Sequence, residues 1–411
     1  MNPSATLPAD REAAQDLLGE LTELRRSIHR HPELGLDLPV TQQAVVDALD
    51  GLGLEVRTGD ALTSVVADLD TGRPGPTILL RGDMDALPMP EDTGLGYASE
   101  LDGRMHACGH DAHVAMLVGA ARILAARRDE LRGRVRFMFQ PGEEGSGGAE
   151  IMIREGVLDG VDGAFAMHIA PTLWAGALAI KPGPMLAATD EFEVTITGRG
   201  GHASTPHWAT DPVPVAAEII VALQSMVTRT VDAFNPAVLT VARVDAGTAF
   251  NVIPETATLG GTIRTVDEKV RASVGEHLER VVDGVCAAHG CTAEVVLTAG
   301  YPVTRNDARF TEFVREVVPP LLDAPGLLEL PAPVMGAEDF SYVLDGVPGA
   351  MAFLGVCPPE EPDPFAAPAC HSNRMVLHEP AMATGVAVHV AVASRFLTDP
   401  PEWVGIVGEA V

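Results

Sequence analysis

Nine consecutive residues, Met105 to His113, read MHACGHDAH and contain three histidines, one cysteine and one aspartate. Thiolate, imidazole and carboxylate groups are all competent ligands for zinc or a similar divalent ion. A cysteine with a nearby histidine base is also the pair that a thiol nucleophile needs. A third interpretation is a polar loop in which Asp111 caps the helix that follows. Each interpretation requires partners from elsewhere in the chain.

Three other short segments supply such partners. Asp83 and Asp85 follow the apolar run TILL, Glu143 and Glu144 follow VRFMF, and His168 follows AFAM. Taken alone, a histidine after a strand is more often a hydrogen-bonded histidine than a metal ligand. A thiol nucleophile would leave the glutamate pair and His168 unexplained, whereas a metal centre with a carboxylate base uses all of these groups. We therefore favour the metal centre.

Strands and helices alternate around these segments. Apolar residues recur every three or four positions from Asp10 to His31, which predicts an amphipathic helix ended by Pro32. A second helix is expected from Thr41 to Leu52, and the run DAHVAMLVGAARILAARR predicts a buried helix. This order favours an α/β domain with a mixed, mostly parallel sheet sandwiched by helices. Because loops beyond the carboxyl ends of parallel strands share one edge, the chemical groups should converge there.

The pattern changes after Pro184. The runs EFEVTITG, AVLTVARVDAG, ATLGGTIRT and TAEVVLTAG read as strands, with helices expected over Pro212–Arg229 and Asp267–His289. The order β-α-β-β-α-β is that of a ferredoxin-like α+β domain. We therefore predict a first domain that begins with residues 1–185, an inserted domain over 186–299, and a return to the first domain over 300–411.

Composition excludes several classes of function. The net charge of −29 over 411 residues leaves no basic surface for nucleic acid or anionic membranes. No basic region precedes an apolar run at the N-terminus, and no run approaches ~20 uninterrupted apolar residues, so we expect a cytoplasmic protein. Five cysteines do not suggest a disulfide framework, and Cys286 and Cys291 are expected to be small buried residues.

Ten motifs in order carry a family resemblance: RGDMDALP, MHACGHDAH, QPGEEGSGGAEIMI, MHIAP, GRGGHASTPH, DPVPVAAEIIVALQSMVTR, NVIPE, GTIRT, MGAEDFS and ACHS. Together they resemble the aminoacylase/carboxypeptidase metallohydrolase superfamily, and within it the amidohydrolase branch. That branch includes hippurate hydrolases, N-acyl-amino-acid amidohydrolases and auxin-conjugate hydrolases. The resemblance covers nearly the whole chain and implies a zinc-exopeptidase-like first domain with an inserted lid and dimerisation domain.

The resemblance also implies a centre of two divalent metal ions, which could be zinc, manganese, cobalt or nickel. Glu143 would be the general base, and Asp85 would hold the ligand residues in place without binding a metal itself. The implied ligands are Cys108, His110, Glu144, His168 and His371. The thiolate of Cys108 would take the place of the carboxylate that bridges the metals in related branches. His106 and His113 are then expected to be supporting groups.

In the inserted domain, the motif GRGGHASTPH carries His202. The resemblance implies that this histidine reaches the site of a neighbouring subunit and stabilises the developing oxyanion, which implies a homodimer. Asn251 and Arg264 resemble positions near the substrate carboxylate, although Arg264 could equally be a surface charge on a strand. Cys370, next to His371, is expected to point away from the site.

The implied reaction is hydrolysis of the amide bond of an N-acyl-amino acid by a metal-activated water. A dipeptidase or carboxypeptidase with the same metals is the second candidate. A metal-binding protein without catalysis is the third, but the presence of Glu143 and the full ligand set argues against it. The motifs do not specify the acyl group, the amino acid or the native metal.

Overall fold

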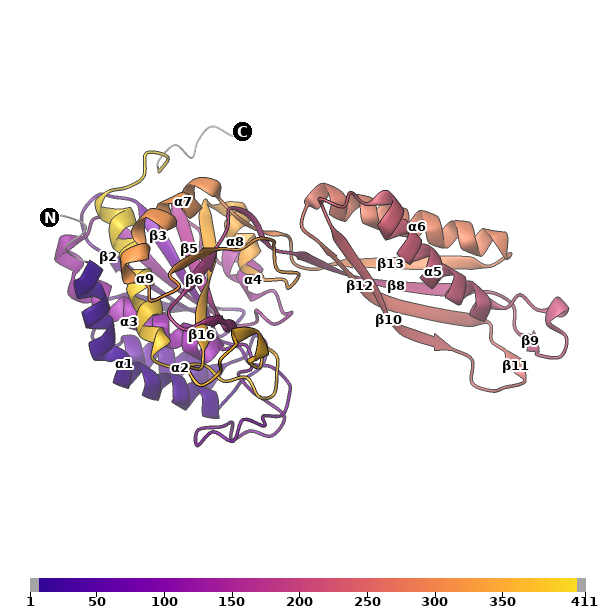
Figure 1. Ribbon diagram of the computed structural model, residues 1–411, viewed down its shortest axis with the longest axis horizontal. Coiled ribbons are helices and arrows are strands. Elements are labelled where there is room, and N and C mark those ends of the chain that lie inside the picture. The colour runs from indigo at the N-terminus through magenta and orange to yellow at the C-terminus, as the bar shows by residue number, and fades with distance from the viewer. Residues whose placement is uncertain (1–6, 405–411) are drawn as a thin grey trace. The chain divides into compact units, whose positions relative to one another are not determined.

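The computed structural model describes residues 7–404 of the chain (Figure 1). Residues 1–6, which belong to the N-terminal stretch searched for a signal peptide, lie outside the described residues. The chain forms two compact units. The larger unit comprises Met1–Gly183, Arg305–Pro331 and Tyr342–Val411, and the smaller unit comprises Pro184–Thr304 and Ala332–Ser341. The predicted insertion, residues 186–299, falls within the smaller unit.

An eight-stranded sheet runs through the larger unit, in the order β1-β2-β4-β3-β5-β16-β6-β15. The central strands β4, β3, β5 and β16 pair in parallel, whereas β1, β2 and β4 pair antiparallel at one side. On the other side β6 is antiparallel to β16 and parallel to β15. The strands are β1 (Glu55–Thr58), β2 (Val65–Asp70), β3 (Thr77–Asp83), β4 (Arg134–Gln140), β5 (Gly163–Trp174), β6 (Leu178–Ile180), β15 (Leu327–Glu329) and β16 (Gly349–Cys357). The predicted mixed, mostly parallel sheet is confirmed.

Helices α3 and α9 pack against this sheet, and α1 packs on both of them. The close approach depends on Gly119 of α3, where an added Cβ would lie 2.7 Å from Leu21 of α1 and 2.8 Å from Val386 of α9. Nearly every residue of α3 is buried, as the sequence predicts. The helices are α1 (Leu7–Arg30), α2 (Pro39–Leu49), α3 (His110–Ala126), α4 (Gly148–Arg154), α7 (Ala308–Val317), α8 (Phe340–Gly346) and α9 (Ala381–Thr398).

The first two predicted helices are confirmed, although α1 begins at Leu7 rather than Asp10 and α2 begins at Pro39 rather than Thr41. Helix α2 stops at Leu49 rather than Leu52. The chain becomes extended at Asp50 (φ −60°, ψ 143°), and Gly51 then has a φ of +74°. The left-handed backbone conformation costs little energy only for glycine, so the chain turns at Gly51 instead of continuing the helix.

The smaller unit has the predicted ferredoxin-like order of elements. Its four strands form an antiparallel sheet in the order β10-β12-β8-β13, which places the first and third strands at the centre. Buried residues at helical spacing, such as Val215, Ile219 and Leu223 of α5, pack with the sheet into one core. The elements are β8 (Ala188–Thr197), α5 (Pro212–Thr230), β10 (Ala237–Ala246), β12 (Thr256–Thr265), α6 (Glu268–Ala288) and β13 (Thr292–Ala299). Two short pairs accompany them, β9 (Gly201–His202) with β11 (Val252–Ile253) and β7 (Gly183–Leu186) with β14 (Thr304–Asn306).

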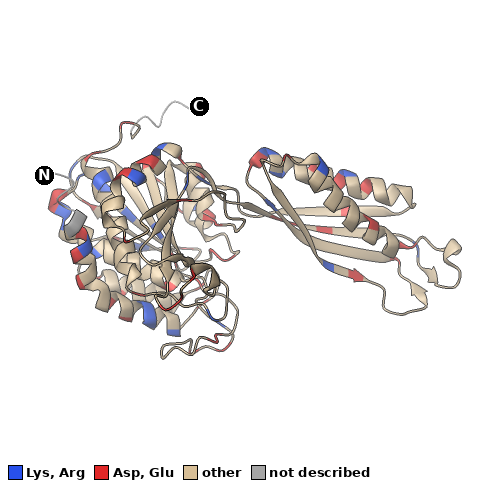
Figure 2. Cartoon of the chain, viewed as in Figure 1, with Lys and Arg blue, Asp and Glu red and all other residues tan. Residues whose placement is uncertain are grey.

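Among the described helices, α5 and α9 are long and apolar enough to cross a membrane by length and composition alone. Most of α9 is buried inside the larger unit, with Phe396 and Val390 fully enclosed, as in the core helix of a globular protein. Helix α5 covers the four-stranded sheet with its apolar side. Charged residues of both signs occur along α1 and α6 (Figure 2).

Candidate metal centre

The loops after β3 and β4 are tied together by one carboxylate. Asp85 lies just beyond β3, and its two oxygens accept hydrogen bonds from the backbone nitrogens of Glu143 (3.0 Å) and Glu144 (2.9 Å). Both glutamates lie in the loop after β4, which runs parallel to β3. The predicted meeting of these two loops at one sheet edge is therefore confirmed.

The sequence prediction that His168 follows its strand is wrong, because His168 lies within β5. Strand β5 is longer than its neighbour β3, whose pairing with it ends at Arg81 and Ala166. Beyond that point β5 continues along β16, where His168 pairs with Phe353. The histidine therefore lies two residues beyond the last β3–β5 pair, level with the end of β3 and close to the loops that meet there.

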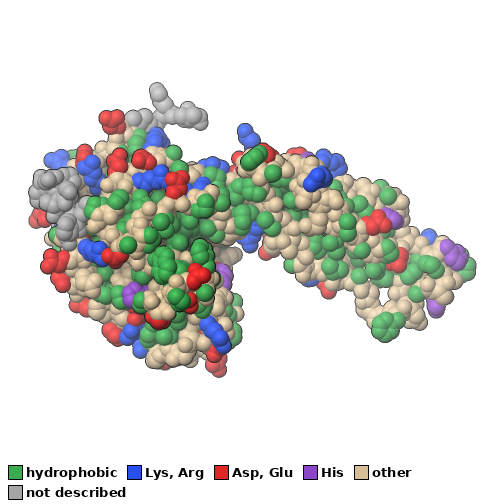
Figure 3. All heavy atoms as spheres, viewed as in Figure 1, with side chains coloured by type: hydrophobic (Ala, Val, Ile, Leu, Met, Phe, Trp, Pro, Cys, Tyr) green, Lys and Arg blue, Asp and Glu red, His purple; other side chains and the backbone are tan. Residues whose placement is uncertain are grey.

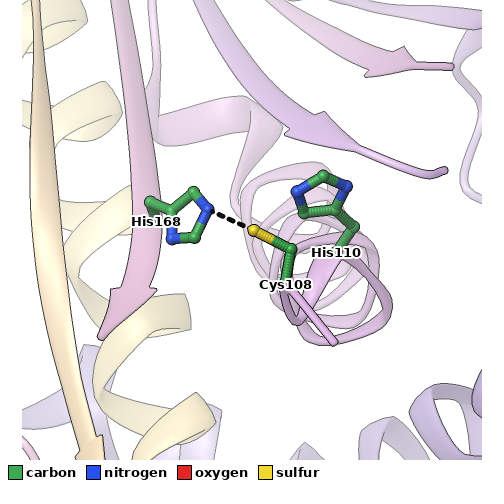
Figure 4. A group of neighbouring side chains, drawn as sticks. All are labelled: Cys108, His110 and His168. Atoms are coloured by element: carbon green, nitrogen blue, oxygen red, sulfur yellow. Dashed lines mark hydrogen bonds between the residues drawn. The ribbon is translucent and has the colours of Figure 1, made fainter. Parts of the chain in front are cut away.

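Cys108 and His110 reach the same place from the start of α3 (Figure 4). The Cys108 sulfur lies 3.2 Å from Nε2 of His168, and one ligand atom from each of these three residues lies within 4.8 Å of the others. Gly109, between the cysteine and the histidine, has a φ of +84°, and an added Cβ would lie 2.5 Å from the side chain of Ile169. Only glycine fits that position.

Glu144 and His371 complete the group. Nε2 of His371 lies 3.2 Å from Oε1 of Glu144, and Nε2 of His110 lies 4.0 Å from the same oxygen. Ligand atoms of Cys108, Glu144 and His371 also lie within 4.8 Å of one another. The structure thus brings together all five residues named as ligands, with Cys108 and Glu144 shared between overlapping groups. Glu143, the proposed base, joins His110 and Glu144 in another such group.

The hydrogen bonds at this centre leave ligand atoms available. Nδ1 of His110 lies 2.8 Å from the backbone oxygen of Asp85, and Nδ1 of His168 lies 2.7 Å from that of Ile169. A carbonyl oxygen only accepts, so Nδ1 carries a proton in each ring and Nε2 is the atom that can bind a metal. Nε2 of His110 is buried without a hydrogen-bond partner, and the buried Oε1 of Glu144 has only the ion contact with His371. Buried polar atoms are rarely left unpaired, and a divalent cation would satisfy both.

The electrostatics of the centre disfavour a thiol nucleophile. The hydrogen bond with Cys370, together with burial, raises the pKa of Cys108 well above that of an ordinary thiol. Burial lowers the pKa of His168 to about 3. A nucleophilic cysteine needs a depressed pKa and a base that can take its proton. Cys108 and His168 meet neither requirement, whereas a cation would displace the proton of the Cys108 thiol on binding.

A buried hydrogen bond under the centre involves Asp83, a residue to which the sequence assigned no role. Nδ1 of His113 lies 2.5 Å from Asp83, and Nε2 of His113 accepts a hydrogen bond from the backbone nitrogen of Ile169 (2.9 Å). Burial alone would raise the pKa of Asp83, but Arg81, His110 and His113 hold it well below its ordinary range. His113 thus supports the chain beside His168, as expected. Asp83 belongs to the motif RGDMDALP, but the motif does not predict that this aspartate binds a histidine 30 residues away.

Asp111 does not cap α3, so that interpretation is wrong. Gly109 is the residue before the helix, and no side chain caps it. Asp111 lies in the first turn, where its Oδ2 is 2.7 Å from Nε of Arg25 and 2.7 Å from Nδ1 of His29. All three side chains are buried. His106 is buried as well, with both ring nitrogens unpartnered, and burial lowers its pKa to about 3.

The prediction that Cys370 points away from the site is also wrong. Its sulfur lies 3.9 Å from the backbone oxygens of Cys108 and Ile169. The turn is made at His371, whose φ of +69° is the only positive value among the described residues other than glycine. That backbone conformation brings the cysteine before it against the centre.

The residues proposed to contact substrate lie in the smaller unit. His202 pairs with Val252, and the backbone nitrogen of Ala203 donates to the oxygen of Asn251 (3.1 Å), so His202 and Asn251 are neighbours. Both are exposed. Arg264 is half-buried near the C-terminal end of β12, whereas His202 and Asn251 lie near the start of that strand. An extended strand of this length separates the two ends by ~25 Å. Within one subunit the structure does not bring Arg264 to the other two.

Known proteins share this sequence and fold. The sequence model of peptidase family M20/M25/M40 matches residues 79–395. An N-acetyl-L-cysteine deacetylase of Bacillus subtilis is 41% identical over 340 residues, which are 82% of this chain and 80% of that protein. Thermostable carboxypeptidase 1 of Saccharolobus solfataricus is 38% identical over 380 residues, 92% of this chain and 95% of that protein.

A solved structure agrees with these relatives. The Bacillus subtilis YXEP protein, described as a dinuclear metal binding peptidase from the M20 family, superposes with a TM-score of 0.78 at 35% identity. The match covers 92% of this chain and 98% of that one. The resemblance that the ordered motifs carry is confirmed. This chain therefore belongs to peptidase family M20/M25/M40 and is a metallohydrolase of amide bonds in the amidohydrolase branch of that family.

Proposed function

We propose that the protein hydrolyses the amide bond of N-acyl-amino acids or similar amino-acid conjugates. The observation that carries this proposal is the buried cluster of thiol, imidazole and carboxylate groups, in which His110 presents an unpartnered Nε2 next to the carboxylates of Glu143 and Glu144. The 41% identity to an N-acetyl-L-cysteine deacetylase supports an acylated amino acid as the substrate class.

Two divalent cations, of zinc, manganese, cobalt or nickel, would be held by the five residues Cys108, His110, Glu144, His168 and His371. Bound there, they would polarise the amide carbonyl and lower the pKa of a water molecule to roughly 7. Glu143 takes the proton of the attacking water and later gives it to the leaving amine. Asp85 positions this base through its hydrogen bond to the Glu143 backbone.

Paired substitutions of the adjacent glutamates test this assignment. Glu143→Gln should keep the metal content of the wild type and lose ~10²–10⁴-fold in kcat, because only the proton acceptor is removed. Glu144→Gln should instead lose metal, measured by elemental analysis after dialysis. Wild-type turnover by Glu143→Gln, or full metal content in Glu144→Gln, would overturn the assignment.

We propose further that the enzyme is a homodimer in which His202 of one subunit donates to the oxyanion in the site of the other. Exposed hydrophobic side chains support an interface on the smaller unit, because such patches mark protein contacts. The face in view in Figure 3 shows hydrophobic atoms across this unit. The exposed large hydrophobic residues of the unit are Trp208, Val213, Val221, Phe234, Val238, Val244, Phe250, Val252, Val296, Leu297 and Val334.

Subunit mixing tests the homodimer. Glu143→Gln and His202→Ala should each be inactive alone. Mixed dimers formed at equal concentrations should recover about a quarter of the wild-type activity, because half of the dimers then contain one intact site. The absence of any recovery in confirmed mixed dimers would place His202 in its own subunit's site.

A carboxypeptidase activity is the second candidate, which the 38% identity to a thermostable carboxypeptidase supports. The two activities differ in whether the substrate nitrogen bears an acyl group or a free α-amine. Comparing kcat/KM for N-acetyl-amino acids with that for dipeptides of the same C-terminal residue separates them. A preference for the dipeptides would favour the second candidate.

A further inference from the structure

Two cysteine thiols meet at the candidate metal centre. Cys108 is buried, with 7% of its surface exposed, and Cys370 is half-buried. The sulfur of Cys370 lies 3.9 Å from the backbone oxygen of Cys108, although the two residues are 262 positions apart in sequence. All five cysteines of the chain are free thiols. The proposed function assigns a role to Cys108 but none to Cys370.

The backbone holds the two thiols in place. The nitrogen of His371 donates to the oxygen of Ala107 (2.8 Å), and each cysteine lies one residue from this bond. Segments joined by a backbone hydrogen bond run about 5 Å apart. A disulfide requires roughly 4.4–6.8 Å between the two Cα atoms, and segments with this spacing permit that distance. The left-handed conformation of His371 fixes the direction of Cys370.

We propose that Cys108 and Cys370 are a site of reversible oxidation, at which a hydroperoxide converts the metal-free centre to a Cys108–Cys370 disulfide. The sulfur of Cys370, the more exposed of the two, attacks the peroxide and becomes a sulfenic acid, and the peroxide's other oxygen leaves as water or an alcohol. The sulfur of Cys108 then attacks the sulfenic sulfur, the S–S bond forms, and the S–O oxygen leaves as water. The thiols lose two electrons and the peroxide gains them.

Oxidation and metal binding compete for the same sulfur. The competition rests on the proposed function, because it takes Cys108 as a metal ligand, whereas the disulfide itself depends only on the position of the two thiols. A sulfur in a disulfide has no thiolate to offer a cation. Bound metal should therefore protect the pair, and the disulfide should prevent metal from binding until a dithiol reduces it.

Peptide mapping of the full-length protein tests the inference directly. Chelator-stripped protein is treated with hydrogen peroxide, free thiols are alkylated, and the protein is digested with trypsin without reduction. Cleavage after arginine gives the peptides 105–122, with Cys108, and 316–374, with Cys357 and Cys370. We expect these two peptides to be joined, and dithiothreitol should separate them.

Two matched variants assign the link. Cys357→Ser should keep the joined peptides, since the remaining cysteine of 316–374 is Cys370. Cys370→Ser should not form them. Protein preloaded with Zn²⁺ should form the link several-fold more slowly, and linked protein should bind less Zn²⁺ in elemental analysis until it is reduced.

Several outcomes would overturn the inference, and they differ from a failure of the proposed function. Separate peptides after peroxide treatment of the wild type would exclude the disulfide, even if the protein binds metal and is active. A bond confined to Cys286 and Cys291, which are neighbours in the smaller unit, would do the same. Joined peptides in a protein that binds no metal would instead support the disulfide and contradict the proposed function.

Discussion

At the scale of single residues, hydrogen bonds to backbone atoms direct the chemistry of this centre. His110 and His168 each donate Nδ1–H to a carbonyl oxygen, so that Nε2 is left as the ligand atom of both rings. Asp85 holds the loop that carries Glu143 and Glu144 in place, because its carboxylate accepts hydrogen bonds from the backbone nitrogens of both glutamates. The side chains that support the ligands therefore matter for metal affinity as well as the ligands themselves.

Replacing Asp85 by asparagine should weaken metal binding. The amide has one accepting oxygen, and its NH₂ group would face the second backbone nitrogen, so the loop that carries Glu143 and Glu144 loses one of its two anchors. We expect metal affinity to fall ~10–100-fold, measured by competition with a chelating dye. Asp162→Asn is the matched control, because Asp162 accepts a single backbone hydrogen bond from Thr77 at the start of β3. Unchanged affinity in Asp85→Asn would contradict the prediction.

His389 should make the stability of the larger unit depend on pH. This side chain is buried in α9 with Nδ1 unpartnered, and burial lowers its pKa to about 3. In the unfolded chain its pKa is near 6.5, so below that pH only the unfolded state binds the proton. The stabilising effect of the neutral ring is present above pH 6.5 and is lost as the pH falls toward 3.

The comparison is with His389→Leu in urea denaturation. Between pH 7.0 and 5.5 the wild type should lose about 1.2 kcal/mol more unfolding free energy than the variant. Between pH 7.0 and 8.5 the two proteins should change in parallel, which serves as the control. Parallel curves over the acidic range as well would show that His389 becomes protonated in the folded protein.

At the scale of elements, two ion pairs join α1 to α3, one buried and one exposed. Arg25 of α1 meets Asp111 in the first turn of α3, and both side chains are fully enclosed. Burial alone would raise the pKa of Asp111, but Arg25 and His29 hold it far below its usual range. Arg122 of α3 meets Glu20 of α1 at the surface, with the glutamate 71% exposed. The first pair anchors the end of α3 from which Cys108 and His110 reach the centre.

These two pairs should differ greatly in their effect on stability. Arg25→Leu leaves the buried carboxylate of Asp111 with His29 as its remaining partner and should cost about 3–5 kcal/mol of unfolding free energy. Arg122→Ala, the matched control between the same helices, should cost no more than about 1 kcal/mol because solvent screens the exposed pair. Urea denaturation followed by circular dichroism measures both. Similar small losses from the two variants would show that Arg25 does not anchor α3.

At the scale of the whole molecule, the five proposed ligands all belong to the larger unit, although His371 is distant from the others in sequence. A ligand that binds only the folded state stabilises it by about 2.7 kcal/mol at a concentration of 100 Kd. Metal should therefore protect the larger unit against opening and have no direct effect on the smaller one.

Hydrogen–deuterium exchange with and without Zn²⁺ measures this difference. We expect slower exchange in α3 and β5, which carry or adjoin the ligands, and unchanged exchange in α6 of the smaller unit. Chelator-treated protein to which Mg²⁺ is added is the control for ionic strength, because Mg²⁺ binds thiolate and imidazole poorly. Protection confined to α6, or absent from α3, would contradict the ligand assignment.

The sequence by itself determined the elements and the segments that carry the chemistry. Helical periodicity marked α1, α5 and α6, and the order of strands and helices predicted both sheets, because these patterns are local properties of the chain. The glutamate pair and the cysteine–histidine motif were visible for the same reason, and parallel strand order predicted that their loops would meet.

Only the tertiary structure decided how side chains from distant segments pair. The sequence did not reveal that Asp83 holds His113, that Arg25 meets Asp111, or that Cys370 turns toward Cys108. Each of these contacts joins residues far apart in the chain, and the last depends on the left-handed backbone of His371. Periodicity encodes which face of an element is buried, whereas the direction of a side chain in a loop depends on a single φ angle and on its distant neighbours.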